Sequence, residues 1–333
     1  MSISVAKRYL VTGGTGFLGS ALVRRLIERG NAVRVLNNDF RGSRNRLQHL
    51  HGQFEFVAAD IRDTEAVSQA ARDVDAICHL AFINGTEFFY SQPNLVLDVG
   101  VRGMVNVLDA CARNGIAELV LASSSEVYHE PPAIPTAEDV PLKIPDPSNP
   151  RYSYAAGKII SEVMALNFGR ERLQRVVIFR PHNVYGPEMG WEHVIPQFLL
   201  RMRSLSAGRS NAVDFPIQGD GQQTRAFVFI NDFIDGLELV LEKAKHMETY
   251  HIGTEEEINI ARLAEMVAEH YGLQIKVVPG PAAIGGTSRR CPDISKMKQL
   301  GYKPKVSLRQ GVEIMARWCE ANAPHAHSNL APA

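Results

Sequence analysis

A tyrosine and a lysine four residues apart form the clearest pair that could transfer a proton. Tyr154 and Lys158 begin a stretch with a helical pattern, residues 151–172, and their i, i+4 spacing puts both side chains on one helix face. A phenol with an ordinary pKa of about 10 is a poor base at neutral pH. Neighbouring positive charge favours the phenolate. The pair therefore predicts a tyrosine base that is activated by a lysine.

A polar segment follows the predicted strand at residues 119–123 and supplies further candidates. Ser124 and Ser125 could hydrogen-bond a substrate hydroxyl or carbonyl, or they could cap backbone groups in a polar turn. Glu126 could remove an acidic proton next to a ketone, or it could be a loop carboxylate that pairs with a lysine or arginine. Both interpretations stay open for these residues.

Four residues in the second half are candidates for binding a substrate. Arg225 and Arg290 are expected to hold a diphosphate, because a planar guanidinium binds two oxygens at once, although each could instead be a solvated surface charge. Asn183 follows a predicted strand and could contact the substrate. His193 lies in an irregular stretch, where it could act as an acid or base or pack in a lid. The spacing of the histidines and cysteines predicts no metal site.

A glycine-rich turn at residues 9–19 could cradle a phosphate. A β-branched apolar run ends in glycines, and an amphipathic segment at 20–29 follows at once. Gly13 would permit a tight turn, Gly16 would let a pyrophosphate approach the backbone, and Gly19 would let the helix lie close to the sheet. The order of strand, turn and helix N-terminus predicts a dinucleotide site, with a ligand-free glycine turn as the alternative.

The end of the second predicted strand bears on the identity of the dinucleotide. A fold of this kind usually places an acid there to bind the adenosine ribose. Asn37 occupies the position, Asp39 follows two residues later, and arginines lie nearby. We expect NAD, and the missing acid leaves NADP open. Asp60 and Ile61 could meet the adenine, although Asp60 could also be a helix N-cap or a turn residue.

The first half of the chain alternates between two kinds of pattern. This alternation predicts an α/β fold with a Rossmann-like, doubly wound parallel sheet, whose ligands lie beyond the carboxyl ends of the strands. Beyond the first strand, which leads into the glycine turn, strands are expected at residues 33–36, 54–58, 76–79, 119–123 and 176–179. Helices are expected at residues 20–29, 64–72, 93–114 and 151–172.

The second half predicts a smaller α+β C-terminal substrate lobe. We expect a Rossmann domain at residues 1–180 that also receives elements from about 225–255, a lobe mainly at 181–322, and a disordered tail at 323–333. Residues 131–150 are rich in proline and predict an extended loop. Strands are expected at 225–229 and 249–253, and helices at 194–205, 231–244, 260–271, 294–300 and 308–321.

Composition narrows the class of protein. The 333 residues carry no formal net charge and are 45% hydrophobic, which gives no general attraction to nucleic acid or membrane. We expect no signal peptide, and no apolar run is long enough to span a bilayer. The four cysteines are widely spaced, as expected for reduced thiols in a cytoplasmic protein.

Taken together, these motifs resemble those of extended short-chain dehydrogenases/reductases, and within them the NAD-dependent nucleotide-sugar epimerase/dehydratase family. The resemblance runs from about residue 7 to residue 320. Its markers are residues 12–19, 60–61, 79–81, 124–128, 154–158, 180–187, 225–227 and 290–295.

The resemblance implies a bound NAD that is reduced and reoxidised within one cycle, and a nucleotide-diphosphate sugar as substrate. Tyr154 would take the proton of the sugar C4 hydroxyl, Lys158 would hold the nicotinamide ribose, and Ser124 would bond the C4 oxygen. The catalytic candidates are thus Ser124, Ser125, Glu126, Tyr154 and Lys158. The residues expected to bind the cofactor are Gly13, Thr15, Gly16, Phe17, Leu18, Asn37, Asp39, Asp60, Ile61, Leu80, Ala81, Tyr154, Lys158 and Pro181.

The fate of the 4-keto intermediate would decide the reaction. A 4-epimerase is the leading expectation, and the alternative is a 4,6-dehydratase or decarboxylase with Glu126 as base. Ser125 stands where dehydratases of deoxythymidine sugars carry an aspartate. Gly100 departs from the family pattern on the cofactor side, as Asn37 does. A non-catalytic NAD-binding sensor or scaffold is the third possibility, although such relatives commonly lose the tyrosine or lysine retained here.

Family members often form homodimers in which two long helices of each chain build a four-helix bundle. Those helices correspond to residues 93–114 and 151–172, and we expect a homodimer. The apolar candidates for that face, which could equally face the sheet, are Val99, Val107, Ile160 and Met164.

Overall fold

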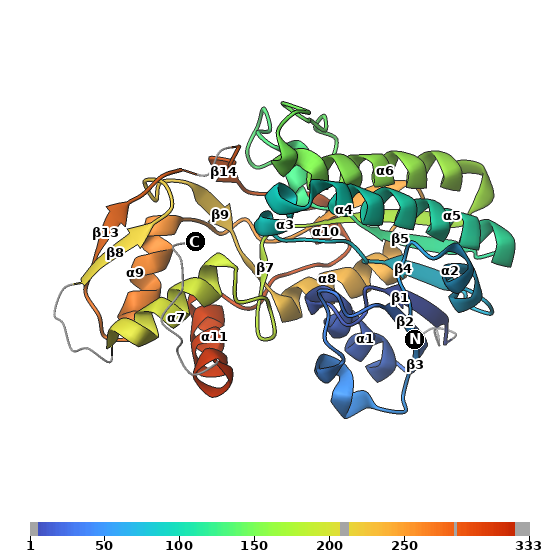
Figure 1. Ribbon diagram of the computed structural model, residues 1–333, viewed down its shortest axis with the longest axis horizontal. Coiled ribbons are helices and arrows are strands. Elements are labelled where there is room, and N and C mark those ends of the chain that lie inside the picture. Colours follow the sequence, from blue (N-terminus) through green and yellow to red (C-terminus); the bar gives the residue numbers. More distant parts are fainter. Residues whose placement is uncertain (1–5, 207–212, 283–284, 324–333) are drawn as a thin grey trace.

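A seven-stranded, all-parallel sheet forms the centre of the protein (Figure 1). The structure, a computed structural model, describes residues 6–206, 213–282 and 285–323. The predicted Rossmann-like sheet is confirmed. In spatial order its strands are β3 (Glu55–Ala58), β2 (Ala32–Asn37), β1 (Arg8–Thr12), β4 (Ala76–His79), β5 (Glu118–Ala122), β6 (Arg175–Pro181) and β11 (Glu248–Ile252).

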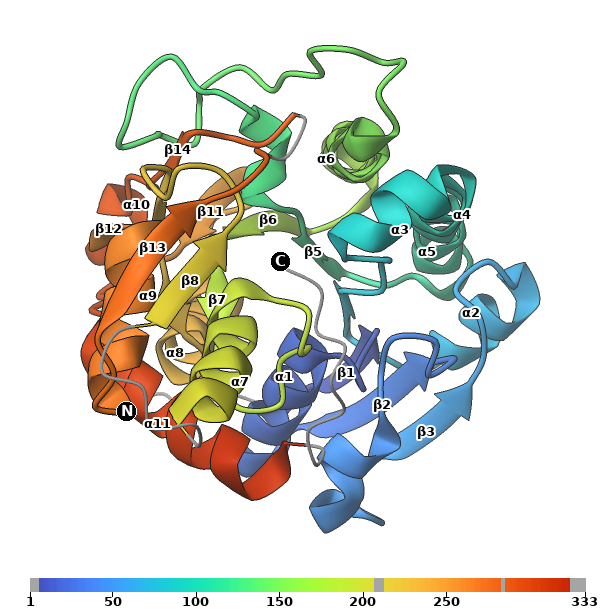
Figure 2. The ribbon, with the colours of Figure 1, turned by 60° about the vertical axis from the view of Figure 1, so that its left-hand side comes forward.

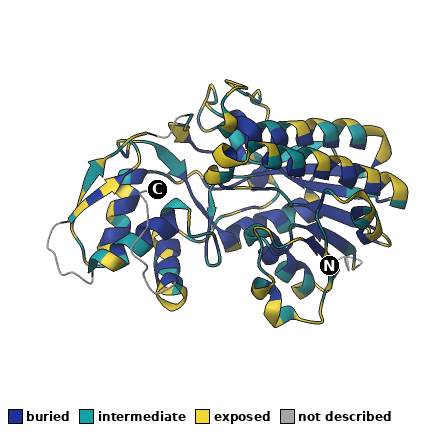
Figure 3. Ribbon diagram, in the orientation of Figure 1, coloured by how far each residue is buried: buried dark blue, intermediate teal, exposed yellow. Residues whose placement is uncertain are grey.

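Helices cover both faces of this sheet, which explains why its strands are apolar on both sides (Figures 1 and 3). In β1, Tyr9 and Val11 face one buried cluster, whereas Leu10 faces the other. The first face carries α1 (Phe17–Glu28) and α8 (Ile230–Lys243). The second face carries α2 (Thr64–Ala70), α5 (Gly103–Asn114) and α6 (Ser153–Arg172).

The order of the strands reverses between β1 and β4. From β1 the chain proceeds outward through β2 and β3, and then returns to β4 on the other side of β1. In open α/β sheets a ligand crevice forms outside the carboxyl ends of the strands at such a point. Thr12 pairs with His79 in the register of β1 and β4, so the glycine turn after Thr12 lies at that reversal.

Two predicted elements differ in detail. The helix expected at residues 93–114 consists of α4 (Pro93–Leu97), a π-helical turn (Asp98–Arg102) and α5. The strand expected at 225–229 is divided into β9 (Thr224–Ala226) and β10 (Val228–Phe229), and neither joins the main sheet. β11 takes the sheet edge beside β6, so β10 pairs instead with β7 (Val184–Tyr185), beyond the end of β6.

A smaller lobe follows β6 and lies beyond the carboxyl ends of the strands (Figures 1 and 2). The predicted division into residues 1–180 and 181–322 stays a proposal, but α8 and β11 clearly pack with the central sheet. The remaining paired strands are β8 (Val213–Ile217) with β13 (Ile275–Pro279), and β9 with β12 (Glu257–Asn259) and β14 (Arg289–Arg290). The other helices after β7 are α7 (Val194–Ser206), α9 (Ile260–His270), α10 (Ser295–Gln299) and α11 (Leu308–Asn322), of which α10 packs against β11.

The connecting segments also bear on the predictions. The proline-rich stretch contains neither helix nor strand between the 3-10 helices Ser125–Tyr128 and Pro150–Tyr152, as expected. A further 3-10 helix, Arg44–Leu50, and α3 (Thr86–Ser91) border the sheet end. The predicted disordered tail falls almost wholly on residues 324–333, outside the described part. No helix among the described residues is long and apolar enough to cross a membrane.

Candidate active site

A cleft of about 1530 Å³ lies beyond the carboxyl ends of the central strands and extends to the lobe. It brings together most of the predicted site residues from both halves of the chain. Those that line it are Gly13, Gly16, Phe17, Leu18, Asn37, Asp60, Ile61, Leu80, Ala81, Ser124, Ser125, Glu126, Tyr154, Lys158, Pro181, Asn183, His193 and Arg290. Three of the predicted residues do not line it: Thr15, Asp39 and Arg225.

The glycine turn has the shape of a phosphate cradle. Gly13 has φ +72°, and a Cβ atom there would lie only 2.8 Å from the backbone nitrogen of Ala81. A Cβ atom on Gly19 would overlap the carbonyl oxygen of Gly13, so glycine lets α1 start close to the turn. Gly16 is the N-cap of α1 and provides no side-chain cap. The N–H groups of the first turn are thereby left for an anion, and the turn fits the pyrophosphate of a dinucleotide.

Ser124, Tyr154 and Lys158 lie together in the cleft. Burial raises the pKa of the Tyr154 phenol, and a side-chain hydrogen bond with Ser124 only partly opposes this. The Lys158 Nζ donates to the carbonyl oxygen of Ala122 at 2.7 Å and lies 5.7 Å from the centre of the Tyr154 ring. Burial lowers the pKa of Lys158 to about 7, although the charge of Glu162 opposes the shift. Tyr154 therefore needs further positive charge from a bound ligand before it can serve as a base.

Two phenylalanines that sequence reasoning missed enclose this group. The Phe89 ring stacks on Tyr154 at 4.9 Å, and the Phe82 ring packs edge-on against it at 5.1 Å. Lys158 Nζ lies 4.1 Å from the centre of the Phe82 ring. Gly100, in the π-helical turn, makes room for Phe82, because a Cβ atom there would collide with the ring. The only feature of the sequence that could have indicated Phe82 is that it directly follows Leu80 and Ala81, two of the predicted cofactor residues.

A buried ion pair beneath Lys158 was also missed. Arg180 donates to both carboxylate oxygens of Glu162, at 2.9 and 2.6 Å, and both side chains are at most 5% exposed. Ser123 also donates to Glu162, and Arg180 donates to the Tyr128 hydroxyl. Glu162 follows Lys158 by one helical turn, and this i, i+4 spacing could have predicted that the two side chains lie on one face of the helix. The pair fixes α6 against the ends of β5 and β6, and thus places Lys158.

Glu126 is bound by arginines from two other segments. Nη1 of Arg290 donates to Glu126 at 2.8 Å, and Arg151 lies 3.9 Å from the same carboxylate. Burial alone would raise the pKa of Glu126, but Arg290 and then Arg151 more than offset this and hold the pKa below its ordinary value. Arg290 Nη2 donates to Thr287, whereas its buried Nε has no partner among the described residues. Glu126 and Thr287 therefore fix the guanidinium of Arg290, which lines the cleft.

The other predicted substrate residues have different surroundings. Asn183 donates to the carbonyl oxygen of Ala226 at 3.0 Å, and His193 is 38% exposed at the cleft. Arg225 donates to the carbonyl oxygens of Thr224 and Thr287, which hold it outside the cleft lining. Burial, followed by the charge of Arg290, lowers the pKa of Arg225 to about 10. A diphosphate contact by Arg225 stays a prediction, since its donors are turned to the backbone.

Of the remaining predicted cofactor residues, Asp60 lines the cleft, whereas Thr15 and Asp39 do not. Asp60 accepts hydrogen bonds from both the backbone and the side chain of Arg62, so it serves the turn before α2 while it lines the cleft. The N-cap of α2 is Asp63. Thr15 and Asp39 bond to each other at 2.7 Å outside the lining. Cofactor contacts by Thr15 and Asp39 stay a prediction.

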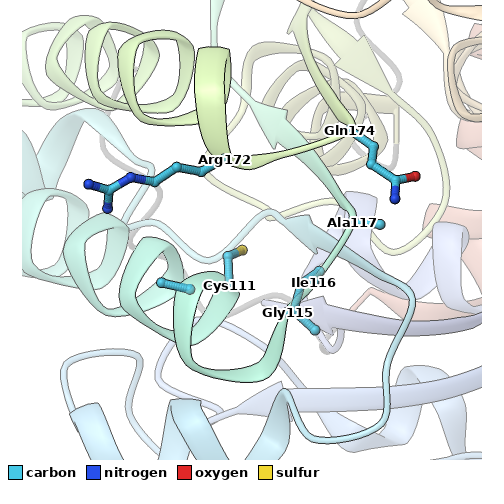
Figure 4. A pocket seen from close by; sticks show the side chains of 7 residues that line it. Cys111, Gly115, Ile116, Ala117, Arg172 and Gln174 are labelled. Atoms are coloured by element: carbon cyan, nitrogen blue, oxygen red, sulfur yellow. The ribbon is translucent and has the colours of Figure 1, made fainter.

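A second cavity of about 360 Å³ lies by the amino end of β5, at the other end of the strands from the cleft (Figure 4). It is formed at the end of α5, the start of β5 and the turn between α6 and β6, with Cys111, Arg172 and Gln174 among its side chains. The amino ends of parallel strands are not where such sheets bind dinucleotides. The large cleft is therefore the candidate active site.

A model of the NAD-dependent epimerase/dehydratase family matches residues 9–253. The chain belongs to this family. UDP-glucuronic acid decarboxylase 2 of Arabidopsis thaliana is 33% identical over 318 residues, which cover 93% of this chain and 67% of the plant protein. This member of the epimerase/dehydratase family is thus similar to a decarboxylase along almost its whole length.

Solved structures of relatives share the fold. A dTDP-glucose 4,6-dehydratase from Streptomyces venezuelae with bound NAD has a TM-score of 0.84 and 30% identity, covering 95% of this chain and 97% of its own. A UDP-glucose 4-epimerase from Thermotoga maritima with UDP-glucose has a TM-score of 0.82 and 27% identity, covering 94% and 99%. This family member is accordingly an NAD-dependent enzyme that modifies nucleotide sugars. Its relatives catalyse three different reactions.

Proposed function

We propose that this enzyme is a decarboxylase of nucleoside-diphosphate uronic acids. The observation that carries the proposal is the Arg290–Glu126 pair in the lining of the cleft, close to Ser124 and Tyr154. A cationic donor at that place suits a sugar whose C6 is a carboxylate. The similarity to UDP-glucuronic acid decarboxylase supports UDP as the nucleotide and glucuronic acid as the sugar.

Decarboxylation needs few catalytic groups once C4 is a ketone. A carboxylate at C6 is then β to the carbonyl, and the C5–C6 bond can break with loss of carbon dioxide. The electron pair of that bond moves to form the C4–C5 enolate, and a proton at C5 restores the ketone. Bound NAD would accept the hydride from C4, and the NADH so formed would return it to C4 and reduce the 4-keto pentose.

The side chains of the cleft divide this work. Tyr154 takes the C4 hydroxyl proton and returns it, and Ser124 hydrogen-bonds the C4 oxygen. Lys158 supplies positive charge that lowers the pKa of the phenol. Arg290 attracts the C6 carboxylate by its positive charge, while Glu126 fixes the guanidinium plane. Each role is a proposal that the shared cleft supports.

Dehydration is less well supported by the same side chains. Loss of a C6 hydroxyl needs an acid to protonate the departing oxygen, and Ser125 is too weak an acid for that role. Glu126 would have to remove the C5 proton, yet two arginines hold its pKa low and so weaken it as a base. Decarboxylation requires neither step. 4-Epimerisation, the reaction expected first from the sequence, requires no residue of the Arg290–Glu126 pair.

Product analysis separates the three reactions. The enzyme is incubated with NAD and either UDP-glucuronic acid or UDP-glucose, and products are followed by NMR together with release of carbon dioxide. We expect one equivalent of carbon dioxide from UDP-glucuronic acid, with UDP-xylose or its 4-keto form. UDP-galacturonic acid without carbon dioxide would overturn the proposal in favour of epimerisation. A 4-keto-6-deoxy sugar from UDP-glucose would overturn it in favour of dehydration.

A further inference from the structure

The carboxyl end of β2 carries an amide where this fold usually places an acid for the adenosine ribose. Asn37 is the last residue of β2, is 9% exposed and lines the cleft. An amide can accept a hydrogen bond from a ribose hydroxyl through its oxygen, or donate to a 2′-phosphate through its nitrogen. The orientation of this amide therefore bears directly on the choice between NAD and NADP.

The carboxylate of Asp39 is folded back beneath Asn37. Asp39 has φ +56°, a left-handed conformation that returns its side chain toward the glycine turn. One oxygen accepts from Thr15 Oγ1 at 2.7 Å and from Asn37 Nδ2 at 3.1 Å, and the other accepts from Arg44 Nε at 2.7 Å. Neither Asp39 nor Thr15 lines the cleft. The carboxylate is thus a support behind the amide.

This contact fixes which amide atom is available. The Asn37 nitrogen is used by Asp39, and the reverse orientation would place the amide oxygen against a carboxylate oxygen. Within the described part of the chain, no donor reaches Asn37 Oδ1. The oxygen is therefore the atom that Asn37 offers to a ligand.

Two arginines near Asn37, which left binding of NADP possible, each form an ion pair with a carboxylate. Arg44 is paired with Asp39, and its guanidinium lies 4.0 Å from the centre of the Phe56 ring. Arg41 is paired with Glu192, and its guanidinium lies 4.8 Å from the centre of the Phe88 ring. A 2′-phosphate would therefore have to compete with a carboxylate for either guanidinium.

We propose that Asp39 sets the preference of this enzyme for NAD by holding the Asn37 amide with its oxygen toward the cofactor. That oxygen accepts a hydrogen bond from the 2′-hydroxyl of NAD, whereas a 2′-phosphate offers it no donor. Asn37 is the specificity-determining residue, and Asp39 is its positioning residue. The inference concerns the cofactor alone and is independent of the reaction at the sugar.

Binding of NADH and NADPH, measured by fluorescence after cofactor exchange, tests this directly. We expect the unaltered enzyme to bind NADH at least about tenfold more tightly than NADPH. Asp39→Gly tolerates the left-handed backbone but removes the carboxylate, and should reduce that ratio about tenfold. Asp39→Asn also tolerates the backbone and retains an oxygen that can accept from Asn37, so it should keep most of the preference.

Three results would overturn the proposal. One is an unaltered enzyme that binds both cofactors equally, and another is an Asp39→Gly variant with an unchanged ratio. The third is an Asp39→Asn variant that loses as much preference as Asp39→Gly, since charge and not amide orientation would then act. A double-mutant comparison gives an independent check. On an Asn37→Ala background, Asp39→Gly should leave the ratio unchanged, and a further loss there would also contradict the positioning role.

Discussion

At the scale of single residues, two adjacent arginines have opposite surroundings. Arg290 is 9% exposed and bound to Glu126 in the cleft, whereas the side chain of Arg289 is 54% exposed and pairs with Glu257. Arg290→Met should lower kcat/KM for UDP-glucuronic acid by at least about 100-fold, since a desolvated charge-assisted contact is lost. Arg289→Met should change it less than about threefold, because an exposed ion pair contributes little. Steady-state assays of carbon dioxide release measure both.

A neutral sugar supplies the control for Arg290. UDP-glucose has no C6 carboxylate, so single-turnover reduction of bound NAD by UDP-glucose should be affected far less by Arg290→Met. Equal losses with both substrates would mean that Arg290 maintains the cleft in general and does not recognise the carboxylate.

Lys158, which we propose as a catalytic residue, is expected to lower the stability of the folded protein. Its folded pKa is about 7, whereas an unfolded lysine titrates near about 10.4, so the unfolded chain binds more protons between these values. The stability of the unaltered protein relative to a Lys158→Met variant should therefore rise with pH from 7 to 10. The full penalty, on the order of a few kcal/mol, is present below pH 7 and disappears above about pH 10.4.

Urea unfolding of both proteins at several pH values measures this difference. At pH 7 we expect the inactive Lys158→Met variant to be the more stable protein, and its advantage should shrink toward pH 10. Lys298→Met provides the control, because that side chain is 52% exposed. A difference between Lys158→Met and the unaltered protein that does not vary with pH would contradict the lowered pKa.

At the scale of elements, local sequence patterns predicted most strands of the central sheet and the helices that cover it. The glycine turn and the Tyr154–Lys158 pair depend on short spacings within one strand, turn or helix, and both were found where expected. Contacts between distant segments could not be predicted in this way. Glu126 and Arg290 are 164 residues apart, and no local rule pairs them. The close approach of Phe82 to Gly100 likewise joins two separate segments, and no local pattern predicts it.

The segment from Glu188 to His193 lines the cleft, and two ion pairs connect it to arginines of the first half of the chain. Arg24 donates to Glu188 at 3.0 Å, and Arg41 pairs with Glu192. These side chains are 27 to 44% exposed, so salt should screen the pairs. We expect NADH to dissociate faster as salt is raised from about 0.1 to 1 M.

Stopped-flow fluorescence of NADH release tests the tie between the segments. Glu192→Gln should release NADH severalfold faster at low salt and respond less to added salt. Arg309→Ala, which removes an exposed pair with Glu269, is the control and should behave as the unaltered protein does. Release that is independent of both salt and Glu192 would show that the ion pairs do not retain the cofactor.

At the scale of the whole molecule, the outer face of α5 and α6 suggests how copies associate. Val99 and Val107, two of the predicted interface residues, are instead buried in the core. Ile160 and Val163 on α6 are 40% and 53% exposed, and Val105 on the neighbouring α5 is 39% exposed. α5 and α6 pack together on one side of the sheet (Figure 1). Large apolar side chains gathered on a helical face often mark an interface, and we propose a homodimer through this face.

A charge in the middle of this face should separate the copies. We expect the unaltered protein to sediment as a dimer at micromolar concentration, and Val163→Glu to sediment as a monomer, because a carboxylate buried at a symmetric interface would face its own copy. Val163→Ala keeps the position apolar and should remain dimeric. Since Val163 is exposed in the single chain, neither change should unfold the monomer, which a thermal melt can verify. A monomeric unaltered protein, or a Val163→Glu variant that stays dimeric, would place the interface elsewhere or remove it.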